Sequence, residues 1–234
     1  MQPTLFIAGD STAAIKGGAE KPMAGWGEFL QPYFGCQLTV ENHAINGRST
    51  KSFLAENRLD YIEKCMKPGD YLFIQFGHND QKKEDPTRYT HPYTQYSHNL
   101  IHFIEAAHRH HCIPILLTSV SRRKYNEAGE LDPEAVGEYP KVTREVATAT
   151  NTALLDIFTA SQALYCQLGK VANKQLFMHL GPLQHPNYPG GITDNTHFSL
   201  DGAQCIAKLV VDAIIQNDQL KGLQQFIHQG MINE

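Results

Sequence analysis

A serine, an aspartate and a histidine stand in this sequence at positions that suit nucleophilic catalysis. Ser11 follows an apolar run at residues 4–8 and then Gly9, so its hydroxyl is expected in an exposed turn, of the strand-to-helix kind, just past the end of a strand. Asp194 precedes His197 by three residues, a spacing that can place both side chains on one side of a turn. Histidine readily accepts a proton near neutral pH, and a carboxylate can orient it. We therefore predict that Ser11 is a nucleophile, His197 its base and Asp194 the partner of that base.

Acyl transfer from an ester also requires hydrogen-bond donors for the oxyanion, and two further turns can supply them. Gly47 follows a predicted strand at 37–42, and Asn79 follows a nearly all-apolar strand at 71–76. The backbone N–H groups of Ser11 and Gly47 and the side-chain amide of Asn79 are the predicted donors. Each of these residues alone also fits an ordinary turn or loop cap. Their joint occurrence at strand ends favours a catalytic site.

Three residues near these turns are candidates for substrate contacts. Trp26, the only tryptophan, can stack on a sugar ring, although a Gly-Trp-Gly segment before a helix more often packs against the sheet. Arg48 and His78 adjoin the predicted oxyanion donors. Each can either contact an acidic sugar or brace its own loop, and both interpretations stay open.

The elements that must position these residues alternate between strands and helices. Apolar or alternating runs predict the strands, and apolar side chains at helical spacing predict the helices. We expect strands at 4–8, 37–42, 71–76, 113–118 and 154–158, helices at 26–34, 53–66, from 96, 139–150, 161–168 and from about 203, and loops at 81–95, 119–136 and 178–193. The loop at 81–95 is long enough to wall a cleft. Strand ends that repeatedly run into glycine and polar residues predict one α/β domain, residues 1–234, with a parallel sheet and its functional loops at the carboxyl edge.

Composition narrows the possible partners. The 234 residues include 41% hydrophobic ones, enough for one sizeable core, and a formal net charge of -4 argues against a nucleic-acid partner. The basic triplet at 122–124 is interpreted as solvated loop charge. Five scattered cysteines without a CxxC pair argue against a disulfide framework or a zinc site. No apolar run approaches the roughly 20 residues that span a bilayer. Unless a leader has been removed, we expect a cytoplasmic protein with no membrane partner.

Four short blocks resemble those of the SGNH (GDSL-type) hydrolases. They are Gly9-Asp10-Ser11-Thr12, Asn46-Gly47-Arg48-Ser49, Gly77-His78-Asn79-Asp80 and Asp194-Asn195-Thr196-His197-Phe198. The Ser-Thr pair, the Gly-Arg-Ser block and the Gly-His-Asn-Asp run are similar to the rhamnogalacturonan acetylesterase branch in particular. The resemblance implies a flavodoxin-like three-layer α/β/α fold with a central parallel sheet of about five strands. It also implies the same catalytic and oxyanion residues as above, an acetylated oligosaccharide as substrate, no cofactor and no metal.

Alternative functions follow from the same residues. An esterase acting on another glycan such as acetyl-xylan, or on a lipid, would keep the same triad, although the polar loops disfavour a lipid. The block at 77–80 resembles a scrambled Gly-Asn-His-Asp metal box of a metallophosphoesterase, but the Asp-x-His and Gly-Asp-x-x-Asp companions of that box are absent. An inactive sugar-binding protein would have no use for a triad. Taken alone, Asp194 also fits a helix N-cap, with His197 in the first turn of the helix.

Overall fold

The central sheet consists of five parallel strands in the computed structural model, which describes residues 2–228 and 230. The strands are β1 (Thr4–Gly9), β2 (Thr39–Asn42), β3 (Tyr71–Gln75), β4 (Ile113–Leu117) and β5 (Ala153–Leu155). Their order, β2-β1-β3-β4-β5, is that of the flavodoxin-like doubly wound folds. The predicted α/β fold with a parallel five-stranded sheet is therefore confirmed. Its carboxyl edge, next to the strand-order reversal at β1, is where such folds place their sites.

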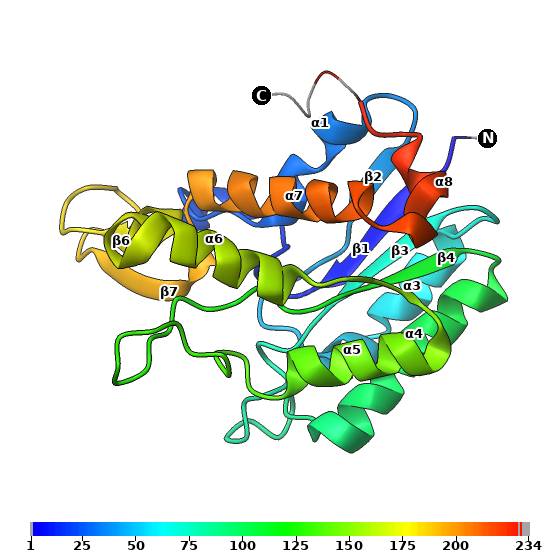
Figure 1. Ribbon diagram of the computed structural model, residues 1–234, viewed down its shortest axis with the longest axis horizontal. Helices are drawn as coiled ribbons and strands as arrows, with labels where there is room; N and C mark the ends of the chain where they lie inside the picture. The colour runs from blue at the N-terminus through cyan, green and yellow to red at the C-terminus, as the bar shows by residue number, and fades with distance from the viewer. Residues whose placement is uncertain (1, 229, 231–234) are drawn as a thin grey trace.

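Helices cover both faces of the sheet and make the three layers seen in Figure 1. They are α1 (Gln31–Phe34), α2 (Thr50–Ala55), α3 (Arg58–Cys65), α4 (Ser97–Arg109), α5 (Tyr139–Thr150), α6 (Ile157–Ala172), α7 (Leu200–Ile215) and α8 (Lys221–Gln224). One core joins the sheet to α1, α6, α7 and α8, and the other joins it to α2, α3, α4 and α5.

Strand β1 shows why the chain forms two cores. Leu5 and Ile7 belong to the core on the α7 side, whereas Phe6 and Ala8 belong to the core on the α4 side. Successive side chains of a strand point to opposite faces, so a strand covered on both sides must be apolar throughout. Each large side chain buried in this way contributes about 1.5–3 kcal/mol to folding. This packing fixes β1 rigidly and therefore fixes the position of the turn that follows it.

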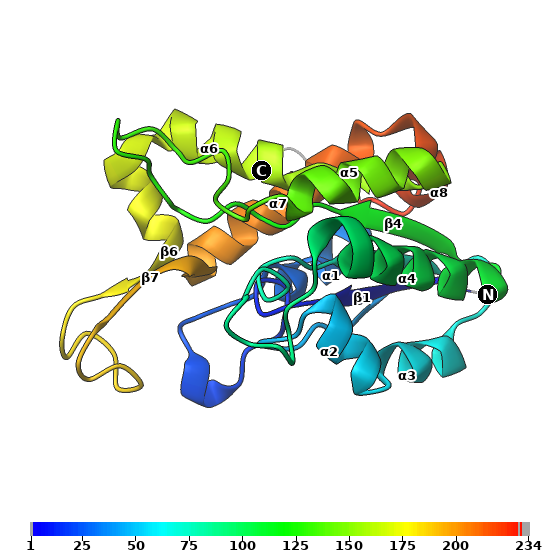
Figure 2. The same ribbon diagram turned by 90° about the horizontal axis from the view of Figure 1, so that it is seen from below.

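A second, two-stranded sheet was not predicted. Strands β6 (Phe177–Leu180) and β7 (Ile192–Phe198) pair in antiparallel fashion, and Figure 2 shows them projecting beyond the end of the main sheet. The prediction of an irregular loop over 178–193 is correct only for its central part. Prolines and glycines are frequent in that segment, so its sequence does not show the strand pattern at its two ends.

Several helix boundaries differ from expectation for local reasons. The helix predicted at 53–66 is broken by Asn57, whose φ of 55° is left-handed, into α2 and α3. The strand predicted at 154–158 ends early because Asp156 caps α6 by accepting a hydrogen bond from Thr159 N–H. Instead of one helix over 26–34, a 3-10 helix (Trp26–Phe29) precedes α1.

Candidate active site

The predicted nucleophile, base and carboxylate form a continuous chain of hydrogen bonds. Ser11 Oγ lies 2.8 Å from His197 Nε2, and His197 Nδ1 lies 2.6 Å from Asp194 Oδ2. Because an ionised carboxylate can only accept, the ring proton belongs on Nδ1. Nε2 is then free to accept the Ser11 proton. The geometry is that of a nucleophile, base and orienting group within direct reach of one another.

The turn after β1 presents Ser11 at the sheet edge. The Asp10 carbonyl accepts hydrogen bonds from the N–H groups of Ala13 and Ala14 at 3.2 and 3.1 Å, which closes the turn immediately after the strand. No helix follows directly, so the expected strand-to-helix turn is a strand-to-loop turn instead. Ser11 itself is only 8% exposed. Its hydroxyl is thus held by the turn and by His197 and does not rotate freely in solvent.

Asp194 and His197 both lie on β7 and not at a helix start. Asp194 Oδ1 accepts the backbone N–H groups of Thr196 at 2.7 Å and of His197 at 3.0 Å, which folds the carboxylate back over its own strand. The N-cap of α7 is Ser199, so the helix-cap interpretation of Asp194 is wrong. Burial by itself would raise the pKa of Asp194. The hydrogen bonds and the charge of His197, together with the hydrogen bond from the Thr196 N–H, outweigh burial and hold this pKa at about 2. The orienting partner is therefore anionic at neutral pH.

The two remaining oxyanion candidates lie close to each other. Gly47 has a φ of 76°, a left-handed conformation that favours glycine. Asn79 Nδ2 donates to the carbonyl of Arg48, the residue after Gly47, at 3.0 Å, and Asn79 Oδ1 accepts from Arg88 Nη1 at 3.3 Å. A carbonyl can only accept and a guanidinium can only donate, so these partners fix which way the amide faces. One Asn79 N–H remains for an oxyanion.

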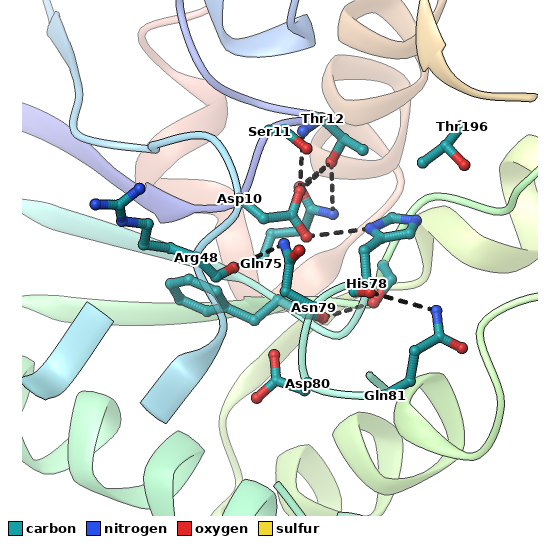
Figure 3. A network of polar contacts seen from close by, with 12 residues as sticks. Asp10, Ser11, Thr12, Arg48, Gln75, His78, Asn79, Asp80, Gln81 and Thr196 are labelled. Carbon is teal, nitrogen blue, oxygen red and sulfur yellow. Dashed lines mark hydrogen bonds and ion pairs between the residues drawn. The ribbon is translucent and has the colours of Figure 1, made fainter. Parts of the chain in front are cut away.

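Behind Ser11, Asp10 and His78 form a buried pair. His78 Nδ1 donates to Asp10 Oδ2 at 3.1 Å, while Thr12 donates to Asp10 Oδ1 through its N–H at 2.9 Å and through its hydroxyl at 2.7 Å (Figure 3). Burial raises the pKa of Asp10, but the charge and hydrogen bond of His78 more than reverse this, so the Asp10 pKa is lowered. Burial also lowers the pKa of His78, with Asp10 opposing. With its side chain only 4% exposed, His78 braces the loop.

Trp26 does not contact substrate from this position. Its side chain is fully buried, and its indole N–H donates to Gln75 Oε1 at 3.0 Å. The suggested sugar stacking is therefore wrong, and packing against the sheet is correct. Arg48 keeps 32% of its side chain exposed, but it pairs with Glu56 at 3.1 Å and donates to the Asn46 carbonyl at 2.9 Å. In this structure Arg48 therefore braces the loop that carries Gly47.

Arg122, interpreted above as a solvated charge, is a contact of the site. Its guanidinium donates to Thr196 Oγ1, between Asp194 and His197, and to the His78 carbonyl at 3.4 Å. It thereby links the loop after β3 to β7. Nothing in the sequence around it predicted this role, because a short basic run in a long loop ordinarily faces water.

Asp80 ties the same loop to the start of α2. Its Oδ1 accepts the hydroxyl of Thr50 at 2.5 Å and that of Thr90 at 2.8 Å, and the N–H of Thr50 at 3.1 Å. Burial raises the pKa of Asp80 to about 7, even though the threonine donors favour its ionised form. The loop from β3 to α4 also lines a cavity of about 410 Å³ with Tyr89 and Tyr93 among its walls.

The described residues show neither a metal-binding cluster nor a membrane-spanning helix. Within the described residues, no group of three or more His, Cys, Asp or Glu side chains is arranged to hold a metal ion. No helix in that part of the chain combines the length and apolar character needed to cross a bilayer.

The amino-acid sequence matches a known protein family over most of its length. The model of the GDSL-like lipase/acylhydrolase family matches residues 7–205, a span that includes every segment of the Ser11 site. The chain belongs to this family. It is 42% identical to rhamnogalacturonan acetylesterase RhgT of Bacillus subtilis over 90% of this chain and 88% of that protein. It is 36% identical to the probable rhamnogalacturonan acetylesterase YesY of the same organism, over 90% and 91% of the two chains.

Solved structures support the fold of this family member. The Bacillus subtilis protein YxiM superposes with a TM-score of 0.76 at 24% identity, over 92% of this chain and 57% of that one. Axe2, an acetylxylan esterase from Geobacillus stearothermophilus, superposes with a TM-score of 0.62 at 19% identity, over 90% and 93% of the two chains. At these identities the likeness concerns the fold alone.

Proposed function

We propose that this protein is a serine esterase that removes O-acetyl groups from rhamnogalacturonan oligosaccharides. The single observation that carries the chemistry is the hydrogen-bonded chain from Ser11 through His197 to Asp194. The substrate class follows from the relatives named above, which share more than a third of their residues with this chain over nearly its whole length.

In the proposed first step, Ser11 Oγ forms a bond to the acetyl carbonyl carbon while its proton moves to His197 Nε2. The carbonyl electron pair moves onto oxygen, which accepts hydrogen bonds from the N–H groups of Ser11 and Gly47 and from Asn79. Collapse of this adduct breaks the bond to the sugar oxygen, which takes the proton from His197. Asp194 stays ionised and stabilises the imidazolium.

In the second step, water attacks the acetyl group on Ser11. His197 accepts the water proton and returns it to Ser11 Oγ, so acetate leaves and the enzyme is regenerated. Trp26 and His78 are given no direct part in either step, because the Trp26 indole N–H is held by Gln75 and His78 is held by Asp10.

The experiment is acetate release from acetylated rhamnogalacturonan oligosaccharides, with acetylated xylan and a long-chain lipid ester as comparison substrates. Ser11→Ala is expected to reduce kcat by at least about 10⁴-fold, as loss of a serine nucleophile does. Ser97→Ala, at the start of α4, is the matched control and should retain full activity. Preference for acetylated xylan would refute the substrate assignment, and an active Ser11→Ala variant would refute the mechanism.

Two further measurements address the remaining alternatives. A serine-directed organophosphate should add one covalent group, at Ser11, to the wild-type protein and none to the Ser11→Ala variant. Lack of reaction by the folded protein would favour a sugar-binding role. Acetate release should persist in excess chelator, which would exclude a metallophosphoesterase, whereas its loss would show that the activity depends on a bound metal ion.

A further inference from the structure

Lys16 holds a buried ammonium group beside the nucleophile. Its side chain reaches back from the loop after β1 and is almost fully enclosed, with only 4% of the residue exposed. Lys16 Nζ donates to the backbone carbonyl of Ser11 at 2.6 Å and to Asn46 Oδ1. Both partners are neutral oxygen atoms. Lysine is rarely buried unless it is paired with an opposite charge, so a buried lysine bonded only to neutral oxygen atoms is unusual.

The two partners of Lys16 belong to the two backbone segments of the proposed oxyanion hole. Ser11 supplies one N–H donor, and Asn46 immediately precedes Gly47, which supplies the second. Asn46 is itself fixed, because its Nδ2 donates to Glu20 Oε1 at 2.6 Å while its Oδ1 faces the ammonium. Lys16 therefore bridges two segments that are 35 residues apart in the chain, counted from Ser11 to Asn46.

Packing alone does not account for a cation at this place. Moving an ammonium out of water is costly, and an apolar side chain of similar size would fill the same space without that cost. Burial lowers the pKa of Lys16, whereas the carboxylates of Glu20, Asp10 and Glu28 favour its charged form. The positive charge is bonded to the carbonyl of Ser11, the residue whose N–H is a proposed donor to the oxyanion. Fixed charges and dipoles aimed at a developing negative charge stabilise a transition state strongly.

We propose that Lys16 is a positioning residue that sets the spacing of the Ser11 and Gly47 N–H groups and whose positive charge favours the oxyanion. The inference rests on the proposed esterase function. It assigns to Lys16 no contact with substrate and no proton transfer.

The test compares Lys16→Arg, Lys16→Gln and Lys16→Met with the wild type on p-nitrophenyl acetate and on acetylated rhamnogalacturonan oligosaccharides. We expect Lys16→Met to lower kcat about 10- to 100-fold with KM changed less than about 2-fold, the pattern of an interaction that is stronger in the transition state. Lys16→Gln should resemble Lys16→Met because it lacks the charge. Lys16→Arg should recover at least part of the activity.

The matched control is Lys21→Met. Lys21 belongs to the same charged cluster and pairs with Glu28 at 2.7 Å, but its side chain is 41% exposed and it does not reach Ser11 or Asn46. Its kcat should stay within about 2-fold of the wild type. To separate catalysis from folding, kcat is expressed per serine titrated by the organophosphate, and thermal unfolding is followed for each variant.

Three results would overturn the proposal. The first is a Lys16→Met variant whose kcat per titrated serine equals that of the wild type, since its deficit would then be one of folding. The second is a Lys16→Gln variant as active as the wild type, which would remove the role of the charge. The third is an equal loss in Lys21→Met. If wild type hydrolyses p-nitrophenyl acetate but not the glycan, the substrate assignment fails while the Lys16 comparison still stands.

Discussion

The amide of Asn79 offers the sharpest test of how the oxyanion hole is built. Asn79 Oδ1 accepts from Arg88 Nη1 at 3.3 Å, and Arg88 is in turn held by Asp85 at 2.6 Å. The same Nη1 lies 3.7 Å from the point where a Cβ would stand on Gly47. Arg88 thus lies against two of the proposed donors. We predict that its main role is to keep the Asn79 amide turned so that an N–H faces the acetyl oxygen.

The expected magnitudes follow from the contacts. Asn79→Ala removes one oxyanion donor and should reduce kcat about 10²–10³-fold. A hydrogen bond from a charged donor contributes about 1.5–3 kcal/mol, and at 3.3 Å this one belongs at the weak end. Arg88→Met should therefore cost about 1.5 kcal/mol, or roughly tenfold in kcat. If Arg88 acts through Asn79, the two losses cannot add.

The assay is a double-mutant cycle in kcat with p-nitrophenyl acetate, using wild type, Arg88→Met, Asn79→Ala and the double variant. In the Asn79→Ala background, Arg88→Met should change kcat by less than about 2-fold. Arg109→Met, which removes an exposed arginine paired with Glu63, serves as the control and should leave kcat unchanged. A full tenfold loss from Arg88→Met in both backgrounds would refute the orienting role and would point to a direct effect of its charge.

Two further predictions concern the carboxylates. The folded pKa of Asp80, about 7, lies above its ordinary value of 3.8, so the contribution of Asp80 to stability falls as pH rises between these values. Asp80→Asn should not show this loss. The difference in unfolding free energy between Asp80→Asn and wild type, measured by urea titration, should shift by about 2 kcal/mol in favour of the variant from pH 5 to pH 7. A difference that is the same at both pH values would contradict the raised pKa. Asp194→Asn should lower kcat about 10⁴-fold at neutral pH, because an amide favours the wrong imidazole tautomer. A loss below tenfold would mean that the Asp194 carboxylate is dispensable.

The sheet and the turns that carry Ser11 and Asn79 could be predicted because their signals are local. Strands β1 and β3 are buried on both faces and therefore read as apolar runs, and each ends where glycine and polar residues begin. Parallel strands bring those ends to one edge without further information. The sequence around Ser11 and Asn79 was therefore sufficient to place both at that edge.

The parts that sequence reasoning missed depend on contacts between distant segments. Strand β6 has only four residues, and β7, although seven residues long, is mostly polar and only partly buried, so neither strand carries a long apolar run or a clear alternation. Trp26 was ambiguous because its burial depends on Gln75, 49 residues away. The role of Arg122 depends on Thr196, 74 residues further along the chain. No local pattern can report an interaction of that span.

His197, the proposed catalytic base, lies on the smaller, projecting sheet, but its strand β7 is anchored to the core next to this residue. Phe198, directly after His197, is 1% exposed and packs in the core on the α7 side of the main sheet. Its carbonyl accepts the Ala24 N–H at 3.1 Å. Ser199 N–H then donates to the Leu176 carbonyl at 3.1 Å before α7 begins. The imidazole is thus positioned by the end of β7 that meets the core, next to Phe198, and by Asp194 on the same strand.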